Sequence, residues 1–525
     1  MASYDIIIKN GMVFDGKENK PAKIDLGIKR GEIKVIRDLS NEKADEVIDA
    51  SGKYVCPGFI DLTNHSDTHW TLFAHPHQES LVKQGVTTII GGTCGSSLSP
   101  LINQNSLKSI SKWTDISSIN INWQTLEEFF SELKKHKLGL NFGTLIGLNT
   151  LQYGVLSGAS RNLSDDDIKE MKYLIESSMK EGAFGLSANL GSVQKEIFND
   201  NVLESLLNSI AKKNGISKHH LEDEGSGILP SISHLISLAR KTKSRLHISH
   251  FKVLGRSAWP FFEDALKIMR NAIKEKVALT GDFFPYERTG SNLFSLLPSW
   301  LRKMNEEEVM RILQIRGTQR RQDIENYLKS LTLHYDKIII ASSVFRMGAV
   351  GKTILEISKK TEVSPEEVII SLLAENNLNV SIFSEVINPG HILEIAKENY
   401  MAIASDGVGY DASSPAIPHP RSFGSFPRAF RLFVKENNIL DWQTAIYKMT
   451  GLPARILGIT DRGTIEKGKK ADIIVFSPEE ISDYSTYENS FRFSEGIEYV
   501  IINGEIVLIN SGLTGKFAGQ IIRKS

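Results

Sequence analysis

The two ends of the chain share a pattern of short β-branched runs separated by tight turns. Near the N-terminus, the segments DIIIKNGMVFDG and KIDLGIKRGEIKVIRD contain N-G, D-G and R-G steps, which favour chain reversals between strands. The C-terminal segments ADIIVFSPEE and EYVIINGEIVLIN have the same pattern, with N-G between two apolar runs, as in a β-hairpin. We therefore predict that residues 1–56 and 455–525 together build one small sheet domain.

Between these ends, apolar strand-like runs alternate with amphipathic helical stretches, which is typical of repeated βα units and a parallel sheet. Eight such runs occur, at residues 59–64, 86–92, 142–149, 182–189, 215–220, 245–250, 277–283 and 400–406. Eight is the number of strands that closes a (β/α)8 barrel. We therefore predict an α/β fold with such a barrel over residues 57–454. Residues 290–395 are mostly helical in pattern, and we interpret them as an insertion near the barrel mouth.

Composition and charge exclude several classes of function. Lys and Arg (62) balance Asp and Glu (62) in the 525 residues, so no global field attracts nucleic acid or an anionic membrane. The two cysteines, Cys56 and Cys94, exclude a disulfide framework and favour a reducing compartment. We find no secretory signal pattern and no apolar run near the about 18 residues of a membrane span. We expect a cytoplasmic protein that acts on a small molecule, without a nucleic-acid or membrane partner.

Side chains able to bind metal or transfer protons follow five of the eight runs. They are His65 after the first run, Cys94 after the second, His220 after the fifth, His250 after the sixth and Asp406 after the eighth. In a (β/α)8 barrel, active sites form at the carboxyl ends of the strands. His220, His250 and Asp282 follow one another at intervals of 30 and 32 residues, one βα unit each. We therefore expect these three at equivalent heights on successive strands.

A cysteine and two histidines suit a catalytic zinc site with three protein ligands and a fourth position for water. Thiolate and imidazole ligands favour zinc over magnesium or calcium, which prefer oxygen. Zinc lowers the pKa of its bound water to about 7 and polarises a carbonyl oxygen. A carboxylate such as Asp406 would then take a proton from the water and pass it to a leaving nitrogen. The pattern indicates a hydrolase.

Each of these residues also has a purely structural interpretation. An isolated cysteine is commonly a small buried hydrophobe, which is our interpretation of Cys56. An aspartate in ASDG, such as Asp406, is also typical of a turn. We interpret His69, His75 and His77 as solvated surface residues. The metal-site interpretation is favoured because the candidate ligands occur together, at the ends of predicted strands.

Seven motifs occur in a fixed order along almost the whole chain: PGFIDLTNHSD, GVTTIIGGTCGSSLSPL, HISHFK, DFFPY, ASDG, HPRSFGSFPR and DRGTIEKGKKADIIVF. Together they resemble the N-acyl-D-amino-acid deacylases (D-aminoacylases) of the amidohydrolase superfamily. The resemblance implies a (β/α)8 barrel with a small β-sandwich built from both termini, and hydrolysis of the N-acyl group from a D-amino acid. It also implies that Cys94, His220 and His250 are zinc ligands, that His65 is the second histidine of a first-strand H-x-H, and that Asp406 is the catalytic aspartate.

The sequence departs from that family at several positions. Thr63 stands where the family has the first histidine of H-x-H, so we expect one zinc per chain and at most a weak second site. The fourth-strand segment GLSAN lacks the bridging carboxylated lysine of many relatives. The Glu and Tyr positions of a family motif are Gly191 and Ser192, and Glu222 stands where an arginine is usual. The substrate carboxylate therefore needs other partners.

The remaining candidates for that carboxylate are Lys252, Tyr286, Arg421 and, in the segment YERTGSN, Ser291. We predict a zinc-dependent amidase that acts on linear N-acyl-D-amino acids, with Asp406 as base and then acid. His65 would support the metal or the oxyanion. Two alternatives stay open: a cyclic-amide or dipeptide hydrolase on the same barrel, and a non-catalytic barrel that serves as a scaffold. The incomplete H-x-H weighs against the first, and the joint presence of the candidate site residues weighs against the second.

Overall fold

A strand lies within or overlaps each of the eight apolar runs in the middle of the chain. The computed structural model describes residues 3–111, 113–157, 159, 161–191, 197–302, 304–331, 333–411 and 417–524. The strands are β8 (Phe59–Asp61), β9 (Val86–Gly91), β10 (Asn141–Thr144), β12 (Gly185–Asn189), β13 (Ile216–His220), β14 (Arg245–Ile248), β15 (Leu279–Phe283) and β19 (Met401–Ile403). A short strand, β11 (Ile146–Gly147), follows β10 and pairs with β12.

These strands pair in parallel and in chain order. One sheet has the order β10-β9-β8 and the other the order β11-β12-β13-β14-β15-β19. A parallel bridge between Asn64 and Gly407 joins the segments that follow β8 and β19. Parallel strands in chain order with helices between them define a mixed α/β fold of the TIM-barrel type. The predicted run 142–149 extends too far, because Leu148–Leu156 forms helix α4, whose Asn149 amide donates to the Gly95 carbonyl (2.8 Å).

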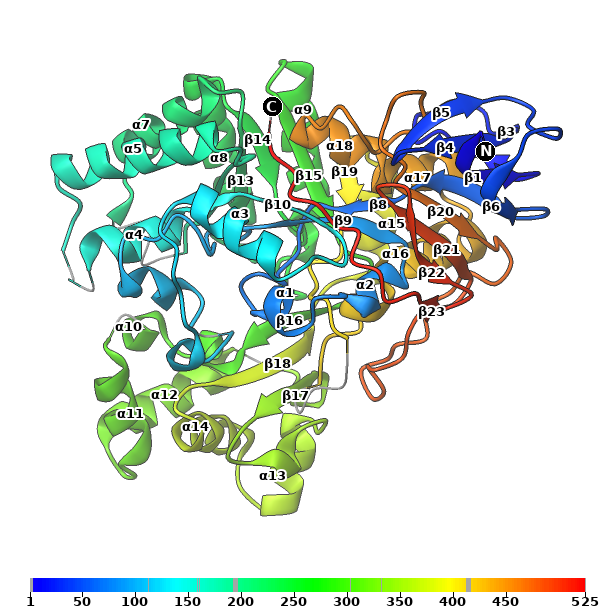
Figure 1. Ribbon diagram of the computed structural model, residues 1–525. Coiled ribbons are helices and arrows are strands. Elements are labelled where there is room, and N and C mark those ends of the chain that lie inside the picture. Colours follow the sequence, from blue (N-terminus) through cyan, green and yellow to red (C-terminus); the bar gives the residue numbers. More distant parts are fainter. Residues whose placement is uncertain are drawn as a thin grey trace.

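Helices lie between and around the strands (Figure 1). Besides α4 they are α1 (Thr71–Ala74), α2 (Glu79–Val82), α3 (Leu126–Lys135), α5 (Asp165–Lys180), α7 (Asp200–Ala211), α8 (Ile228–Thr242), α9 (Phe262–Lys274), α15 (Pro389–Lys397), α16 (Arg421–Ala429), α17 (Trp442–Met449) and α18 (Gly451–Leu457). Helix α9 buries Phe262, Leu266 and Met269 along one stripe, the spacing expected for a helix that packs on a sheet. No helix in the described ranges combines the length and the apolar character needed to cross a membrane.

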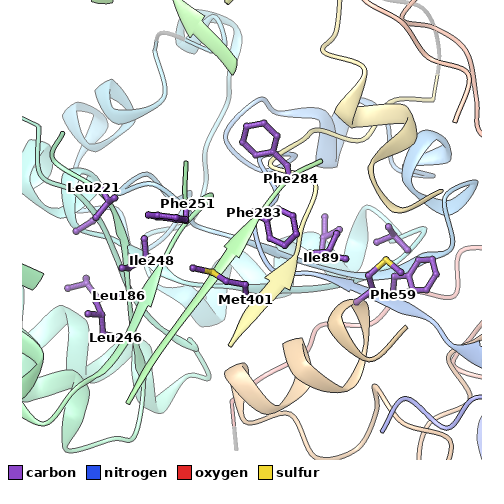
Figure 2. Close-up of a cluster of buried hydrophobic side chains, with 14 of the residues drawn as sticks. Phe59, Ile89, Leu186, Leu221, Leu246, Ile248, Phe251, Phe283, Phe284 and Met401 are labelled. Atoms are coloured by element: carbon purple, nitrogen blue, oxygen red, sulfur yellow. The ribbon is translucent and has the colours of Figure 1, made fainter. Parts of the chain in front are cut away.

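The core of this fold is formed where strand side chains meet those of the helices. Figure 2 shows Phe59, Ile89, Ile248, Phe283 and Met401, which come from different strands and point into one apolar cluster. All five are at most 2% exposed. Burying a side chain of this size stabilises the fold by about 1.5–3 kcal/mol. The strands that carry polar residues at their ends are therefore held by a continuous apolar core.

Two further sheets are built from the ends of the chain, one from N-terminal strands alone and one from strands of both ends. A four-stranded sheet has the order β5-β4-β1-β6, and a seven-stranded sheet has the order β23-β22-β21-β20-β7-β2-β3. Their strands are β1 (Tyr4–Lys9), β2 (Met12–Val13), β3 (Ala22–Lys23), β4 (Leu26–Lys29), β5 (Glu32–Ile36), β6 (Ala44–Asp49), β7 (Tyr54–Pro57), β20 (Ile473–Phe476), β21 (Ile497–Ile502), β22 (Glu505–Ile509) and β23 (Gly512–Leu513). Antiparallel pairing of β20 with β7 joins the two ends. The predicted N-G reversal is present, with φ of 49° at Asn503 and 81° at Gly504.

The segment predicted as a mostly helical insertion also contains a sheet. Its helices are α10 (Ser299–Arg302), α11 (Glu306–Gln314), α12 (Gln319–Ser330), α13 (Ile354–Thr361) and α14 (Pro365–Glu375). Three antiparallel strands, β16 (Arg288–Asn292), β18 (Val380–Glu385) and β17 (Ile338–Ser343), accompany them (Figure 1). The sequence pattern did not reveal this sheet, because β16 has no buried residue and β17 and β18 are short runs next to helical sequence.

Candidate metal centre and active site

The loop after β9 places Cys94 in a constrained backbone. Gly92 has φ of +67°, and a Cβ atom there would lie 2.0 Å from the Leu145 carbonyl oxygen, so only glycine fits. The Gly92 amide donates to Oδ2 of the buried Asp67 (2.6 Å). Cys94 itself has φ of 51°. Such a conformation costs a non-glycine residue about 1–3 kcal/mol and tends to occur at functional sites.

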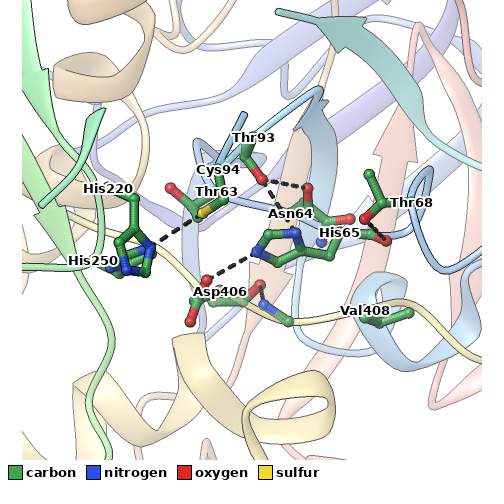
Figure 3. Close-up of polar contacts among 12 residues, drawn as sticks. Thr63, Asn64, His65, Thr68, Thr93, Cys94, His220, His250, Asp406 and Val408 are labelled. Atoms are coloured by element: carbon green, nitrogen blue, oxygen red, sulfur yellow. Dashed lines mark hydrogen bonds and ion pairs between the residues drawn. The ribbon is translucent and has the colours of Figure 1, made fainter. Parts of the chain in front are cut away.

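Cys94, His220 and His250 come together at the ends of β9, β13 and β14. One ligand atom from each lies within 4.8 Å of the others, and Cys94 Sγ is 3.2 Å from His250 Nε2. Figure 3 shows the two imidazole rings beside the cysteine sulfur. Nδ1 of His220 is buried and has no hydrogen-bond partner among the described residues. A thiol, two imidazoles and an unpaired ring nitrogen fit a zinc-type metal ion.

The charges of this cluster reinforce one another. Burial opposes ionisation of the Cys94 thiol, but the adjacent His250 charge and the hydrogen bonds of the neighbouring histidines hold its pKa well below the usual value. Burial and the Lys252 charge disfavour the charged form of His250, yet the Cys94 and Asp406 charges raise its pKa to about 10. The protein thus stabilises a thiolate at Cys94, the form that binds metal.

A buried ion pair lies behind His250. Lys252 Nζ is 2.6 Å from Oε1 of Glu224 and 2.9 Å from Nδ1 of His250. The side chains of Lys252 and Glu224 are only 5% and 7% exposed. Glu224 Oε2 also lies 3.8 Å from Nε2 of His220. The Lys252–Glu224 pair therefore contacts both candidate histidine ligands. Glu224 was not among the predicted site residues, although its position four residues after His220 was an available signal.

Asp406 lies between His65 and Arg421. Its Oδ1 is 3.0 Å from Nε2 of His65 (Figure 3), and its Oδ2 is 2.5 Å from Nη1 of Arg421. Burial raises the pKa of Asp406, but the charges of Arg421 and His250 outweigh it and hold the pKa well below the usual range. Burial opposes the charged form of His65, while hydrogen bonds to Asp406 and Cys94 raise its pKa to about 9. The structure thus places a charged aspartate beside the group of candidate metal ligands.

The other predicted substrate-binding residues lie near Arg421. The backbone amide of Arg421 donates to His419 Nδ1 (3.1 Å), and the ring of His419 contacts that of Tyr286 at 5.3 Å. The hydroxyl of Tyr286 is 3.3 Å from the Pro420 carbonyl oxygen. A Cβ atom at Gly290 would lie 3.6 Å from Nη2 of Arg421. Ser291, the next residue on β16, pairs its hydroxyl with that of Ser295 (3.0 Å).

The structure also describes most of the other residues that the sequence analysis singled out. His69, His75 and His77 are half-buried rather than solvated, because their rings pack on Trp113, Tyr410 and Phe517 respectively. The Gly191 amide donates to Asn189 Oδ1 (3.3 Å) at the end of β12, whereas Ser192 lies outside the described residues. Thr63, the residue that replaces a histidine, is fully buried and donates to Oδ2 of Asp282 (2.5 Å).

The chain is similar in sequence and fold to several known proteins. The model of the Amidohydrolase family matches residues 403–508. Two proteins of Alcaligenes xylosoxydans xylosoxydans align with 99% of this chain: a D-aminoacylase, 25% identical with 98% of its own length covered, and an N-acyl-D-aspartate deacylase, 27% identical with 95% covered. The crystal structure of N-acyl-D-glutamate deacylase from Bordetella bronchiseptica, in complex with zinc and a phosphonate inhibitor, superimposes with a TM-score of 0.84. It is 23% identical, and 99% of each chain is covered.

The chain is thus similar over 99% of its length to D-amino-acid deacylases, and its residues 403–508 match the Amidohydrolase family.

Proposed function

We propose that this chain is a zinc-dependent hydrolase that cleaves the amide bond of N-acyl-D-amino acids and releases a carboxylate and a free D-amino acid. One observation carries the proposal: Cys94, His220 and His250 converge beside Asp406. This occurs in a chain that aligns over 99% of its length with D-amino-acid deacylases. The supporting frame is a closed (β/α)8 barrel over residues 57–454, with an insertion at 290–395 and a terminal β-sandwich from residues 1–56 and 455–525.

Cys94, His220 and His250 would hold one zinc ion per chain, with His65 at its edge. A soft thiolate with two imidazoles suits zinc better than a hard cation. When bound there, zinc supplies a water of lowered pKa and polarises the acyl carbonyl. The Lys252–Glu224 pair holds His250 through its Nδ1, the outer contact that commonly fixes the ring of a histidine ligand.

Asp406 is the proton carrier of this proposal. Its carboxylate accepts a proton from the attacking water and then delivers it to the amine nitrogen as the carbon–nitrogen bond breaks. Arg421 favours the ionised form that can accept the proton, and the hydrogen bond from His65 (3.0 Å) orients the carboxylate. Both ring nitrogens of His65 have partners, Asp406 at Nε2 (3.0 Å) and Oγ1 of Thr93 at Nδ1 (3.3 Å), so the charged ring favours negative charge on the acyl oxygen through its charge alone.

Arg421 is the best-placed group for the substrate carboxylate. Its Nη1 contacts Asp406, while Nη2 lies on the side of Gly290, so one guanidinium can bridge both carboxylates through its separate N–H groups. Lys252, Tyr286 and Ser291 are the further candidates. Lys252 is already paired with Glu224, and we therefore expect it to contribute less than Arg421.

The test combines metal content with substrate release. Purified protein is assayed by elemental mass spectrometry and incubated with the N-acetyl derivatives of D-methionine and L-methionine. We expect about one zinc per chain and release of D-methionine in preference to L-methionine. Bound zinc without release from either enantiomer would refute the proposed substrate class and favour another amide hydrolase. A chain that binds no metal would refute the proposed metal-dependent hydrolase and favour a non-catalytic scaffold protein.

A further inference from the structure

A buried lysine lies on the same strand as the candidate metal ligand His220. Lys218 is on β13, two residues before His220, so strand alternation directs both side chains to the same side of the sheet. Lys218 is only 1% exposed. The register of the sheet pairs it with His247 on β14, whereas the next residue, His219, pairs with Ile248. The proposed mechanism makes no use of this lysine.

The surroundings of the Lys218 ammonium are those of a bound hard cation. Its Nζ donates to the Leu62 carbonyl oxygen and to Oγ1 of Thr63 (2.5 Å each), and lies 3.3 Å from Oδ2 of Asp282. Carbonyl, hydroxyl and carboxylate oxygens are the donors that hard cations select in proteins. An ammonium has three protons, and three oxygens surround this one.

This oxygen pocket is coupled to the metal centre through Asp282 and Thr63. Asp282 Oδ1 accepts a hydrogen bond from the His250 backbone amide (2.6 Å), and its Oδ2 lies 2.8 Å from Nε2 of His247. Thr63 stands two residues before His65 in the segment that follows β8. The pocket therefore shares Asp282 with one candidate zinc ligand, and it shares the segment after β8 with His65.

We propose that the Lys218 side chain occupies a second cation pocket beside the metal centre and so limits that centre to a single metal ion. The inference rests on the proposed metal site. Its physical basis is the repulsion that a metal ion would meet so close to an ammonium, and the occupation of its oxygen ligands by Lys218. Removal of the ammonium is expected to open the pocket to a divalent cation that prefers oxygen.

The experiment uses the zinc-loaded full chain and Mn²⁺, which prefers carboxylate and carbonyl ligands and is detected by electron paramagnetic resonance. Lys218→Ala is expected to bind one Mn²⁺ per chain at least tenfold more tightly than the wild type, without loss of zinc. The matched control is Lys448→Ala. Lys448 is also buried and donates to the carbonyl oxygens of Glu398 and Met401. This control should bind Mn²⁺ no better than the wild type.

Three outcomes would overturn the inference. One is Mn²⁺ binding by Lys218→Ala that does not exceed that of the wild type. Another is an equal gain in Lys448→Ala, which would mean that any buried lysine cavity binds the ion. The third needs no variant, and so stands even if Lys218→Ala fails to fold: a wild-type chain that holds two tightly bound ions at saturation.

The same measurements separate this inference from the proposed function. A wild type that binds no zinc refutes both. A wild type with one zinc, whose Lys218→Ala variant gains the Mn²⁺ site but which releases no D-amino acid, refutes only the proposed reaction.

Discussion

Replacement of Asp406 with asparagine is expected to abolish most turnover while the metal stays bound. The side chains have nearly the same shape, and asparagine tolerates the positive φ of 50° at this position. The amide oxygen can still accept from His65 or Arg421. The substitution therefore removes the capacity to carry a proton while it preserves the local structure.

The expected magnitude follows from the two functions of this carboxylate. Loss of a general acid–base group costs about 10²–10⁴-fold in rate, which corresponds to about 2.7–5.4 kcal/mol of activation free energy. The ion pair with Arg421 adds a cost in stability. Its side chains are 13% and 9% exposed, so the about 3–5 kcal/mol found when one partner of a buried pair is removed is an upper limit here.

The assay measures kcat and KM for release of D-methionine from its N-acetyl derivative, with zinc per chain determined on the same samples. The matched control is Asp411→Asn, five positions further along. Asp411 accepts hydrogen bonds from the backbone amides of His77 (3.0 Å) and Glu79 (2.9 Å), away from the metal cluster. The control should keep its kcat. A kcat within threefold of the wild type in Asp406→Asn, with full zinc, would refute Asp406 as the proton carrier.

Further substitutions test the metal ligand Cys94, the Lys252–Glu224 pair beside His250 and the lowered pKa of the buried Lys448. Cys94→Ala is expected to lose zinc and activity together, whereas Cys56→Ala, in the terminal sheet, should keep both; zinc retained in Cys94→Ala would contradict the ligand assignment. Glu224→Gln leaves Lys252 buried without its charged partner. Loss of such an outer contact to a metal ligand should weaken zinc binding about 10–100-fold in a competition titration. An unchanged zinc affinity would contradict the assignment of the Lys252–Glu224 pair as the support of His250. Burial lowers the pKa of Lys448 from 10.5 to about 8, so the folded state is penalised where this lysine is charged. The free energy of unfolding should therefore rise by up to about 3 kcal/mol between pH 8 and 10.5. In urea denaturation, Lys448→Met should lack this rise. The same rise in both proteins would contradict its attribution to Lys448.

Much of the fold was accessible from local sequence pattern. All eight predicted strand runs contain or overlap a strand of the parallel sheets, because buried strands need continuous apolar segments of limited length. The N-G step at Asn503 formed a hairpin, since both residues of that turn need positive φ. The spacing of His220, His250 and Asp282 by one βα unit likewise predicted that they would lie on successive strands. Such patterns depend only on residues close together in the sequence, so they can be recognised without knowledge of the tertiary fold.

The partners of the charged side chains were decided by the tertiary structure alone. The sequence indicated Arg421 and Lys252 only as candidates for the substrate carboxylate, and it was the fold that paired them with Asp406 and Glu224. The fold also brings Lys218 to Thr63, 155 positions earlier in the chain. Whether two charged side chains form an ion pair depends on the distance between them and on their burial. For residues far apart in the sequence, neither quantity can be inferred from the sequence pattern. The pattern of the chain therefore predicts which strands form, and only their packing in the tertiary structure determines which charges meet at their ends.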